Sequence, residues 1–154
     1  DMTKDIFIEN LRKYKKQMYI IAFSVLQNHA DTEDVVQDSI LNAYRKIHTL
    51  KDDNKFGAWI MKIVVNQAKI HIRKNAKIVY IDDMQDKIDK PVTTDSNEIW
   101  ELVMSLNNDL STVVILHYWQ GYTIKEISEI VGIPEGTVNS RLSRARKILR
   151  KELE

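Results

Sequence analysis

Hydrophobic residues recur at three- and four-residue steps through the first half of the chain, a spacing that is typical of amphipathic helices. The pattern predicts a first helix over residues 4–27 and, after a break at 28–30, a second helix that Asp31 caps. A polar stretch over 48–55 predicts a loop, and a third helix is expected over 56–75. The first half is therefore predicted to be a helical bundle.

The periodicity stops between residues 76 and 94, where aspartates, threonines and a proline leave no stable apolar face. This segment is the expected flexible linker, with a short strand over 77–81 as the alternative for part of it. Two small all-α domains, 1–75 and 95–154, are predicted on either side. Each would bury only about 60% of its unfolded surface, so each would gain stability from a partner.

Helical spacing resumes at about Ser96, and a further helix is expected to end before Gly121. Thr123 and Glu126 have the spacing of a capping box, and Gly132 fits the end of the short helix that they open. Pro134 suits the first turn of the next helix, which is expected over 137–153. A short capped helix, a glycine turn and a longer basic helix are the layout of a helix-turn-helix. Ser128 supplies a small side chain where its two helices cross. The inward side of the longer helix is expected to carry Val138, Leu142, Ala145, Ile148 and Leu149.

Composition narrows the class of protein further. The 154 residues include only four glycines and two prolines, which disfavours all-β folds and nucleotide-binding loops. The absence of cysteine excludes disulfides and thiolate metal sites and fits a reducing compartment. No apolar run approaches a membrane span and no signal peptide is visible, so a cytoplasmic location is expected. The four histidines are scattered without ligand spacing, so neither a metal nor a cofactor is expected.

Charge is patterned although the net charge is only +1. Between Gly136 and Lys151 there are six basic residues and no acid. The polar side of this last helix can hydrogen-bond base edges and phosphates in a major groove, and together with the turn pattern it favours DNA binding. A solvated helix of a bundle is the alternative. The residues on that side are Asn139, Ser140, Ser143, Arg144 and Lys147.

The third helix combines basic and aromatic residues. One face carries Lys55, Lys62, Asn66, Lys69 and Arg73, with Phe56 and Trp59 at its start and Tyr44 and Arg45 at the end of the preceding helix. Rings on which bases stack, beside lysines that follow phosphates, suit single-stranded DNA. Packing in the core is the alternative for the two rings of the third helix, and we expect it for at least one of them.

The second helix begins with an acidic cluster, Asp31, Glu33, Asp34 and Asp38. Its spacing is not that of a calcium loop, which alternates its oxygen ligands around a glycine. We interpret it as a capped, exposed helix start that faces a basic partner.

Two motifs resemble those of the bacterial extracytoplasmic-function (ECF) sigma factors of RNA polymerase. The segment 31–38 (DTEDVVQD), followed by 43–45 (AYR), Phe56, Trp59 and 63–66 (IVVN), is similar to domain two of that family. The segment 136–146 (GTVNSRLSRAR), after 124–132, is similar to the helix-turn-helix of domain four. Both motifs occur in the family's order and together span nearly the whole chain.

The resemblance implies a transcription initiation factor without enzymatic activity or a small-molecule substrate. Its second helix would dock on the clamp helices of the largest polymerase subunit through Asp31, Glu33, Asp34, Val35, Gln37 and Asp38. The opened minus-ten element would be held by Tyr44, Arg45, Lys55, Phe56, Trp59, Lys62, Asn66, Lys69 and Arg73. The minus-thirty-five element would be read by Thr137, Asn139, Ser140, Arg141, Ser143, Arg144 and Lys147.

The resemblance also implies further partners. Domain four would receive the flap of the second polymerase subunit, and an anti-sigma factor, often membrane-tethered in this family, would hold the protein inactive at the inner face of the membrane.

The residues by themselves leave two alternative functions open. A stand-alone repressor or activator would have an effector domain at 1–75 and would be expected to dimerise. A nuclease would use Asp31, Asp34 and Asp38 to hold its metal.

Overall fold

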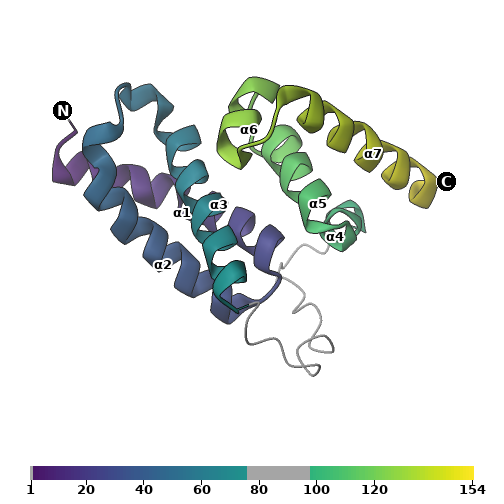
Figure 1. Ribbon diagram of the computed structural model, residues 1–154, viewed down its shortest axis with the longest axis horizontal. Coiled ribbons are helices and arrows are strands. Elements are labelled where there is room, and N and C mark those ends of the chain that lie inside the picture. Colours follow the sequence, from purple (N-terminus) through teal and green to yellow (C-terminus); the bar gives the residue numbers. More distant parts are fainter. Residues whose placement is uncertain (1, 76–97) are drawn as a thin grey trace. The chain divides into compact units, whose positions relative to one another are not determined.

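The structure, a computed structural model, describes residues 2–75 and 98–154. Every regular element in these residues is helical, so the predicted all-α class is confirmed (Figure 1). The chain divides into two compact units, residues 1–89 and 90–154, and each unit is considered by itself. The linker predicted over 76–94 and the strand over 77–81 lie outside the described residues.

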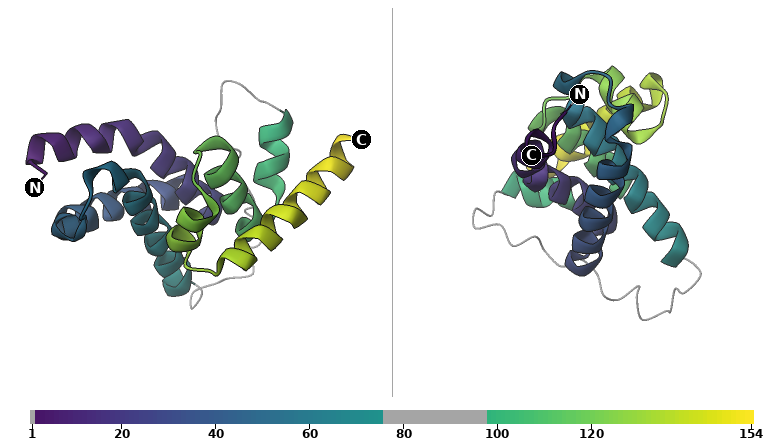
Figure 2. Two further views of the ribbon diagram at one scale, coloured as in Figure 1. Left: turned by 90° about the horizontal axis from the view of Figure 1, so that it is seen from above. Right: turned by 90° about the vertical axis from the view of Figure 1, so that its left-hand side faces the viewer.

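The first unit is a bundle of three long helices, each packed against the other two. Its elements are α1 (Lys4–Leu26), α2 (His29–Lys46), the short 3-10 turns η1 (Ile47–Thr49) and η2 (Asp53–Lys55), and α3 (Phe56–Asn75). Figure 2 shows the bundle from two further directions. The core side chains with no exposed surface include Met18, Ile21, Ala43, Ile60 and Val64. Complete burial of a side chain such as Met or Ile contributes about 1.5–3 kcal/mol each.

The corner between α1 and α2 differs from the sequence prediction. Gln27 turns the chain with a left-handed backbone (φ 54°), and Asn28, rather than Asp31, caps α2. The Asn28 side-chain oxygen accepts a hydrogen bond from the Asp31 backbone N–H at 2.9 Å. The helix therefore begins two residues before Asp31. Asp31 lies in its first turn, where a carboxylate is favoured by the helix dipole.

The second unit is built from shorter helices. They are α4 (Glu98–Ser105), α5 (Asn108–Val114), the π-helical turn η5 (Ile115–Trp119), α6 (Ile124–Val131) and α7 (Glu135–Leu153). The single helix expected to end before Gly121 is thus an α-helix that widens into a π turn. Helix α7 begins at Glu135, with Pro134 as its N-cap instead of inside its first turn.

One core assignment in α7 was wrong. Val138, Leu142 and Ala145 are buried as predicted, but Ile148 is 38% exposed. On a helix of 3.6 residues per turn, Ile148 lies about a quarter-turn from the line through those three residues. Its side chain is therefore not directed into the core with theirs.

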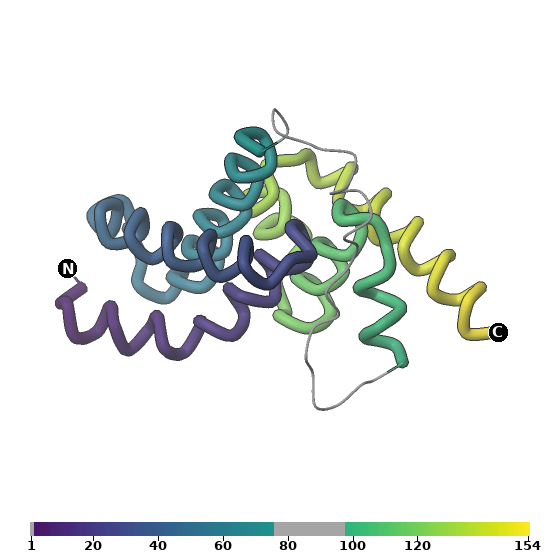
Figure 3. The backbone as a smooth tube through the Cα atoms, turned by 90° about the horizontal axis from the view of Figure 1, so that it is seen from below, coloured from purple at the N-terminus to yellow at the C-terminus, as the bar shows by residue number. Residues whose placement is uncertain are grey.

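Figure 3 shows the backbone turn between α6 and α7. Local hydrogen bonds hold this turn. The capping box is confirmed, since Thr123 Oγ1 accepts from the Glu126 N–H and Glu126 Oε1 accepts from the Thr123 N–H. At the other end of α6, the Ser128 carbonyl accepts from the N–H groups of Gly132 and Ile133. The Ser128 hydroxyl donates to the Ile133 carbonyl at 2.5 Å. Ser128 is therefore a hydrogen-bonding residue of the turn as well as a small one.

Gly132 is the residue whose backbone this turn constrains most. Its φ of 77° lies in the left-handed region, so Gly132→Ala should lower the free energy of unfolding by about 1–2 kcal/mol. Gly136 is the matched control, because it lies within α7 and its Cβ would also meet open space. Gly136→Ala should raise the free energy of unfolding by up to about 1 kcal/mol. Urea unfolding followed by circular dichroism measures both, and equal shifts would contradict the backbone argument.

Candidate functional site

The outer side of α2 is acidic and ends at one exposed apolar residue. Asp34, Gln37 and Asp38 are exposed, and Leu41 follows them at the next helical step with 58% of its surface exposed. Neither the Asp34 nor the Asp38 carboxylate has an ion-pair or hydrogen-bond partner within residues 2–75 and 98–154. Glu33, which is also exposed, lies beside them. This face offers unpaired negative charge next to an apolar side chain.

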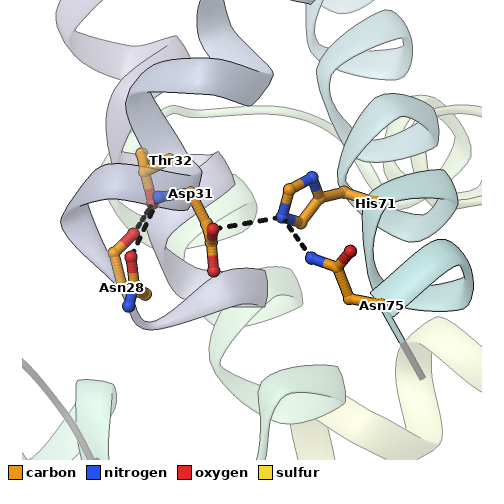
Figure 4. A network of polar contacts seen from close by, with 5 residues as sticks. All are labelled: Asn28, Asp31, Thr32, His71 and Asn75. Atoms are coloured by element: carbon orange, nitrogen blue, oxygen red, sulfur yellow. Dashed lines mark hydrogen bonds and ion pairs between the residues drawn. The ribbon is translucent and has the colours of Figure 1, made fainter. Parts of the chain in front are cut away.

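Two residues of the predicted polymerase-binding set are engaged inside the unit. Val35 is 1% exposed and packs in the core, so we remove it from the candidate contacts. The Asp31 carboxylate lies 3.2 Å from Nε2 of His71 on α3, and the same Nε2 lies 2.9 Å from the Asn75 side-chain nitrogen (Figure 4). Nε2 without a hydrogen can accept from the Asn75 amide, whereas Nε2–H, present in the other neutral tautomer and in the protonated ring, can donate to Asp31. Asp31 therefore links the start of α2 to the end of α3.

The predicted basic stripe of α3 lies on one exposed face. Lys55, Lys62, Asn66, Lys69 and Arg73 are all exposed, and the opposite side of the helix carries the buried Ile60 and Val64. The structure thus brings these five polar residues together, as their spacing predicted.

The aromatic residues near this stripe have different environments. Tyr44 is 55% exposed, and Trp59 is half-buried with its Nε1–H donating to Thr49 Oγ1 at 3.2 Å. Phe56 is 2% exposed, with its ring centroid 5.6 Å from that of Trp59. Phe56 is therefore a core residue and is removed from the DNA-binding set. Tyr44 and Trp59 keep ring surface on the outside of the unit, and Arg45 is exposed next to Tyr44.

The polar side of α7 is exposed along its first three turns. Asn139, Ser140, Arg144 and Lys147 are exposed, and Thr137, Arg141 and Ser143 are half-buried on its flanks. The Ser140 hydroxyl donates to the Gly136 carbonyl at 3.0 Å, which leaves its oxygen able to accept from another group. This face is convex, cationic and rich in hydrogen-bonding groups, which suits a DNA groove.

Two surface features were not predicted from the sequence. Leu41 could have been found from its position one helical step beyond Asp34, Gln37 and Asp38. Tyr118 and Trp119 are 53% and 47% exposed on the π turn, where the Tyr118 hydroxyl accepts from Arg146 at 3.0 Å. Trp119 also makes an edge contact with Trp100, their centroids being 5.4 Å apart. No periodicity signals a π turn, so these two exposures could not be read from the sequence.

Metal chemistry finds no support in the part of the chain that the structure describes. No group of three or more His, Asp or Glu side chains there could hold a metal ion, so the nuclease alternative lacks its site. In the same residues, no helix combines the length and the apolar character that crossing a membrane requires.

Comparisons with known proteins match both units. The chain matches the family described as Sigma-70 region 2 over residues 11–78 and that described as Sigma-70, region 4 over residues 96–149. It is 32% identical to the RNA polymerase sigma factor SigV of Bacillus subtilis (strain 168), covering 98% of this chain and 93% of SigV. It is 30% identical to the ECF RNA polymerase sigma factor SigW of the same strain, over 97% of this chain and 90% of SigW.

Solved structures show the same similarity. The sigma factor RpoE from Bartonella quintana, crystallised with the anti-sigma factor NepR, is 25% identical with a TM-score of 0.78 over 98% of both chains. CnrH, solved with the cytosolic domain of CnrY, has the same fold. It is 20% identical with a TM-score of 0.68, covering 98% of this chain and 89% of CnrH.

At the start of α3, the buried Phe56 should matter for the stability of the fold and the exposed Lys55 should not. Phe56→Ala should lower the free energy of unfolding by about 3–5 kcal/mol, because it empties a core site. Lys55→Ala, at the exposed neighbouring position, should change it by no more than about 0.5 kcal/mol. Urea unfolding monitored by circular dichroism gives both values. A Phe56→Ala protein as stable as Lys55→Ala would show that the ring is not a core residue.

Proposed function

Because the chain belongs to the ECF RNA polymerase sigma factors, which are transcription initiation factors and not enzymes, we propose that it binds core RNA polymerase and directs it to specific promoters. One observation carries the assignment of its surfaces. The first unit keeps an unpaired acidic face on α2 separate from a basic and aromatic face on α3, and α7 of the second unit carries another cationic face. A polymerase surface and two promoter elements require faces of these three kinds.

Each proposed role belongs to one domain. Residues 1–75 act as domain two, residues 95–154 act as domain four, and 76–94 link them. In domain two, the α2 face docks on the clamp helices of the largest polymerase subunit through Glu33, Asp34, Gln37 and Asp38. Leu41 supports this role, since an exposed apolar side chain beside polar groups can serve as an anchor in an interface.

The minus-ten element is held by the other surface of domain two. Bases of the opened strand stack on Tyr44 and Trp59, and its phosphates follow the stripe of Lys55, Lys62, Lys69 and Arg73, with Arg45 beside Tyr44. Asn66, in the middle of the stripe, can hydrogen-bond a base or a sugar. The support is the exposure of both rings beside cations, the combination that binds single strands.

Domain four reads the minus-thirty-five element with α7 in the major groove. Its exposed side presents Asn139, Ser140 and Arg144 to base edges, while Lys147 and Arg141 reach phosphates. Thr137 and Ser143 flank this row. The exposed aromatic surface of Tyr118 and Trp119 receives the flap of the second polymerase subunit, for which its apolar area is the support.

Regulation follows from the relatives. RpoE is bound by an anti-sigma factor in its crystal structure, so we propose that an anti-sigma factor also inhibits this chain. If that inhibitor is membrane-tethered, it holds the protein at the inner face of the membrane.

The proposed function is tested with core polymerase. Tagged protein should retain core polymerase in a pull-down, and adding it to core polymerase should produce run-off transcripts from a subset of genomic promoters. A protein that binds DNA as a dimer and leaves the transcription of core polymerase unchanged would instead be a stand-alone regulator.

The acidic face of α2 gives the first mutational prediction. Asp34→Lys with Asp38→Lys should abolish retention of core polymerase in the pull-down, because reversed charges would face a basic surface. The matched control is Asp5→Lys with Glu9→Lys, an exposed acidic pair of the same spacing on α1. The control should bind normally, and both variants should keep wild-type helicity. Normal binding by the Asp34 and Asp38 variant would refute the docking role of this face.

The cationic face of α7 gives the second mutational prediction. Arg144→Ala should weaken the free energy of promoter binding by about 1–3 kcal/mol and relax the base preference at one base pair, because the Arg144 guanidinium can bond a guanine bidentately. Lys147→Ala should weaken binding to all sequences alike and reduce the salt slope by about one. Binding of the polymerase complex to promoters varied one base pair at a time in the upstream element measures both. If neither variant changes base preference, the readout role of Arg144 is wrong.

A further inference from the structure

The outer side of α1 carries a cluster of cations that the proposed function does not use. Arg12, Lys13, Lys15 and Lys16, here called the α1 basic cluster, are all exposed. None of them has an ion pair or hydrogen bond in the part of the chain that the structure describes. Arg12, Lys13 and Lys16 share an arc of about 100° on the helix. Four cations within five residues repel one another, so the arrangement favours an anionic partner.

The cluster adjoins the aromatic surface at the start of α3. The Lys13 Nζ lies 5.5 Å from the centre of the Tyr14 ring. Tyr14 contacts Phe56 with a centroid separation of 5.7 Å, and Phe56 contacts Trp59 at 5.6 Å. Through the buried Phe56, Tyr14 therefore lies two ring contacts away from Trp59, the residue on which we place a base of the opened strand.

We propose that the α1 basic cluster binds the phosphates of the same single-stranded DNA whose bases stack on Tyr44 and Trp59. The inference rests on the proposed function of domain two and extends its DNA surface from α3 onto α1. Cations beside exposed aromatic rings are the arrangement that follows a single strand.

The chemistry of α1 favours DNA over an anionic membrane. A helix that lies in a membrane surface needs an exposed apolar face, but the apolar side of α1 is buried in the bundle, with Phe7 at 4% and Met18 and Ile21 at 0% exposure.

The test measures binding of the full-length chain to a fluorescent oligothymidylate across a salt series. Arg12→Gln with Lys13→Gln and Lys16→Gln should reduce the slope of log affinity against log salt by about two, because each lost phosphate contact on a single strand removes about 0.7. The control, Lys125→Gln with Arg150→Gln and Lys151→Gln, removes the same charge from exposed positions of α6 and α7 and should leave the slope unchanged. Equal effects of the two triple variants would overturn the proposal, since bulk charge would explain them.

A third variant separates this inference from the proposed function. Lys62→Gln with Arg73→Gln should lower the slope by about 1.4 if α3 holds the strand. If the slope falls in the Lys62 and Arg73 variant but not in the α1 variant, only the proposed role of α1 is refuted. If the slope falls in the α1 variant alone, the proposed role of α3 is refuted. The α1 variant is also tested on vesicles containing phosphatidylserine. Lost vesicle binding with an unchanged DNA slope would assign the cluster to membranes and overturn the proposal.

Discussion

Packing of the apolar side of α3 against both α1 and α2 is the interaction on which the first unit depends. Ile60, Val64 and Ala68 lie along that side without exposed surface. Since one side of α3 is committed to the core, its basic stripe must face outward. The same packing directs the acidic side of α2 away from α3, so one buried contact separates two surfaces of opposite charge.

These surfaces are arranged for partners and not for the stability of the unit. Asp34 and Asp38 lie one turn apart on α2, as do Arg12 and Lys16 on α1. Like charges at this spacing destabilise a helix by about 0.2–0.5 kcal/mol per pair. Such like-charge pairs are costly for the free chain, and an oppositely charged partner would remove that cost.

In the second unit, the position of the cationic helix depends on a short turn. The left-handed backbone of Gly132 and the three hydrogen bonds made by Ser128 fix where α6 ends. Pro134 then caps α7, whose first residue, Glu135, lies two residues before the predicted start at 137. The start of α7 decides which side chains occupy its first turns, and those are the residues that we place against bases.

Local features were predictable from the sequence because local forces determine them. The fold class, the bounds of α3, the capping box and the glycine at the end of α6 depend on helical periodicity and on hydrogen bonds between residues a few positions apart. The sharing of one face by Lys62, Asn66 and Arg73 follows from the pitch of a single helix. For the same reason the polar side of α7 could be assigned before the structure was known.

Burial and long-range pairing were decided only by the tertiary structure. Val35 and Phe56 lie within sequence motifs that resemble binding sites, but the neighbouring helices cover them, while Asp34 and Trp59 keep exposed surface. The link between Asp31 and His71 joins two helices that are far apart in the chain, and the exposure of Leu41 depends on which side of α2 the bundle covers. Periodicity shows which residues share a side of a helix. Whether another part of the chain covers that side depends on how distant segments pack together.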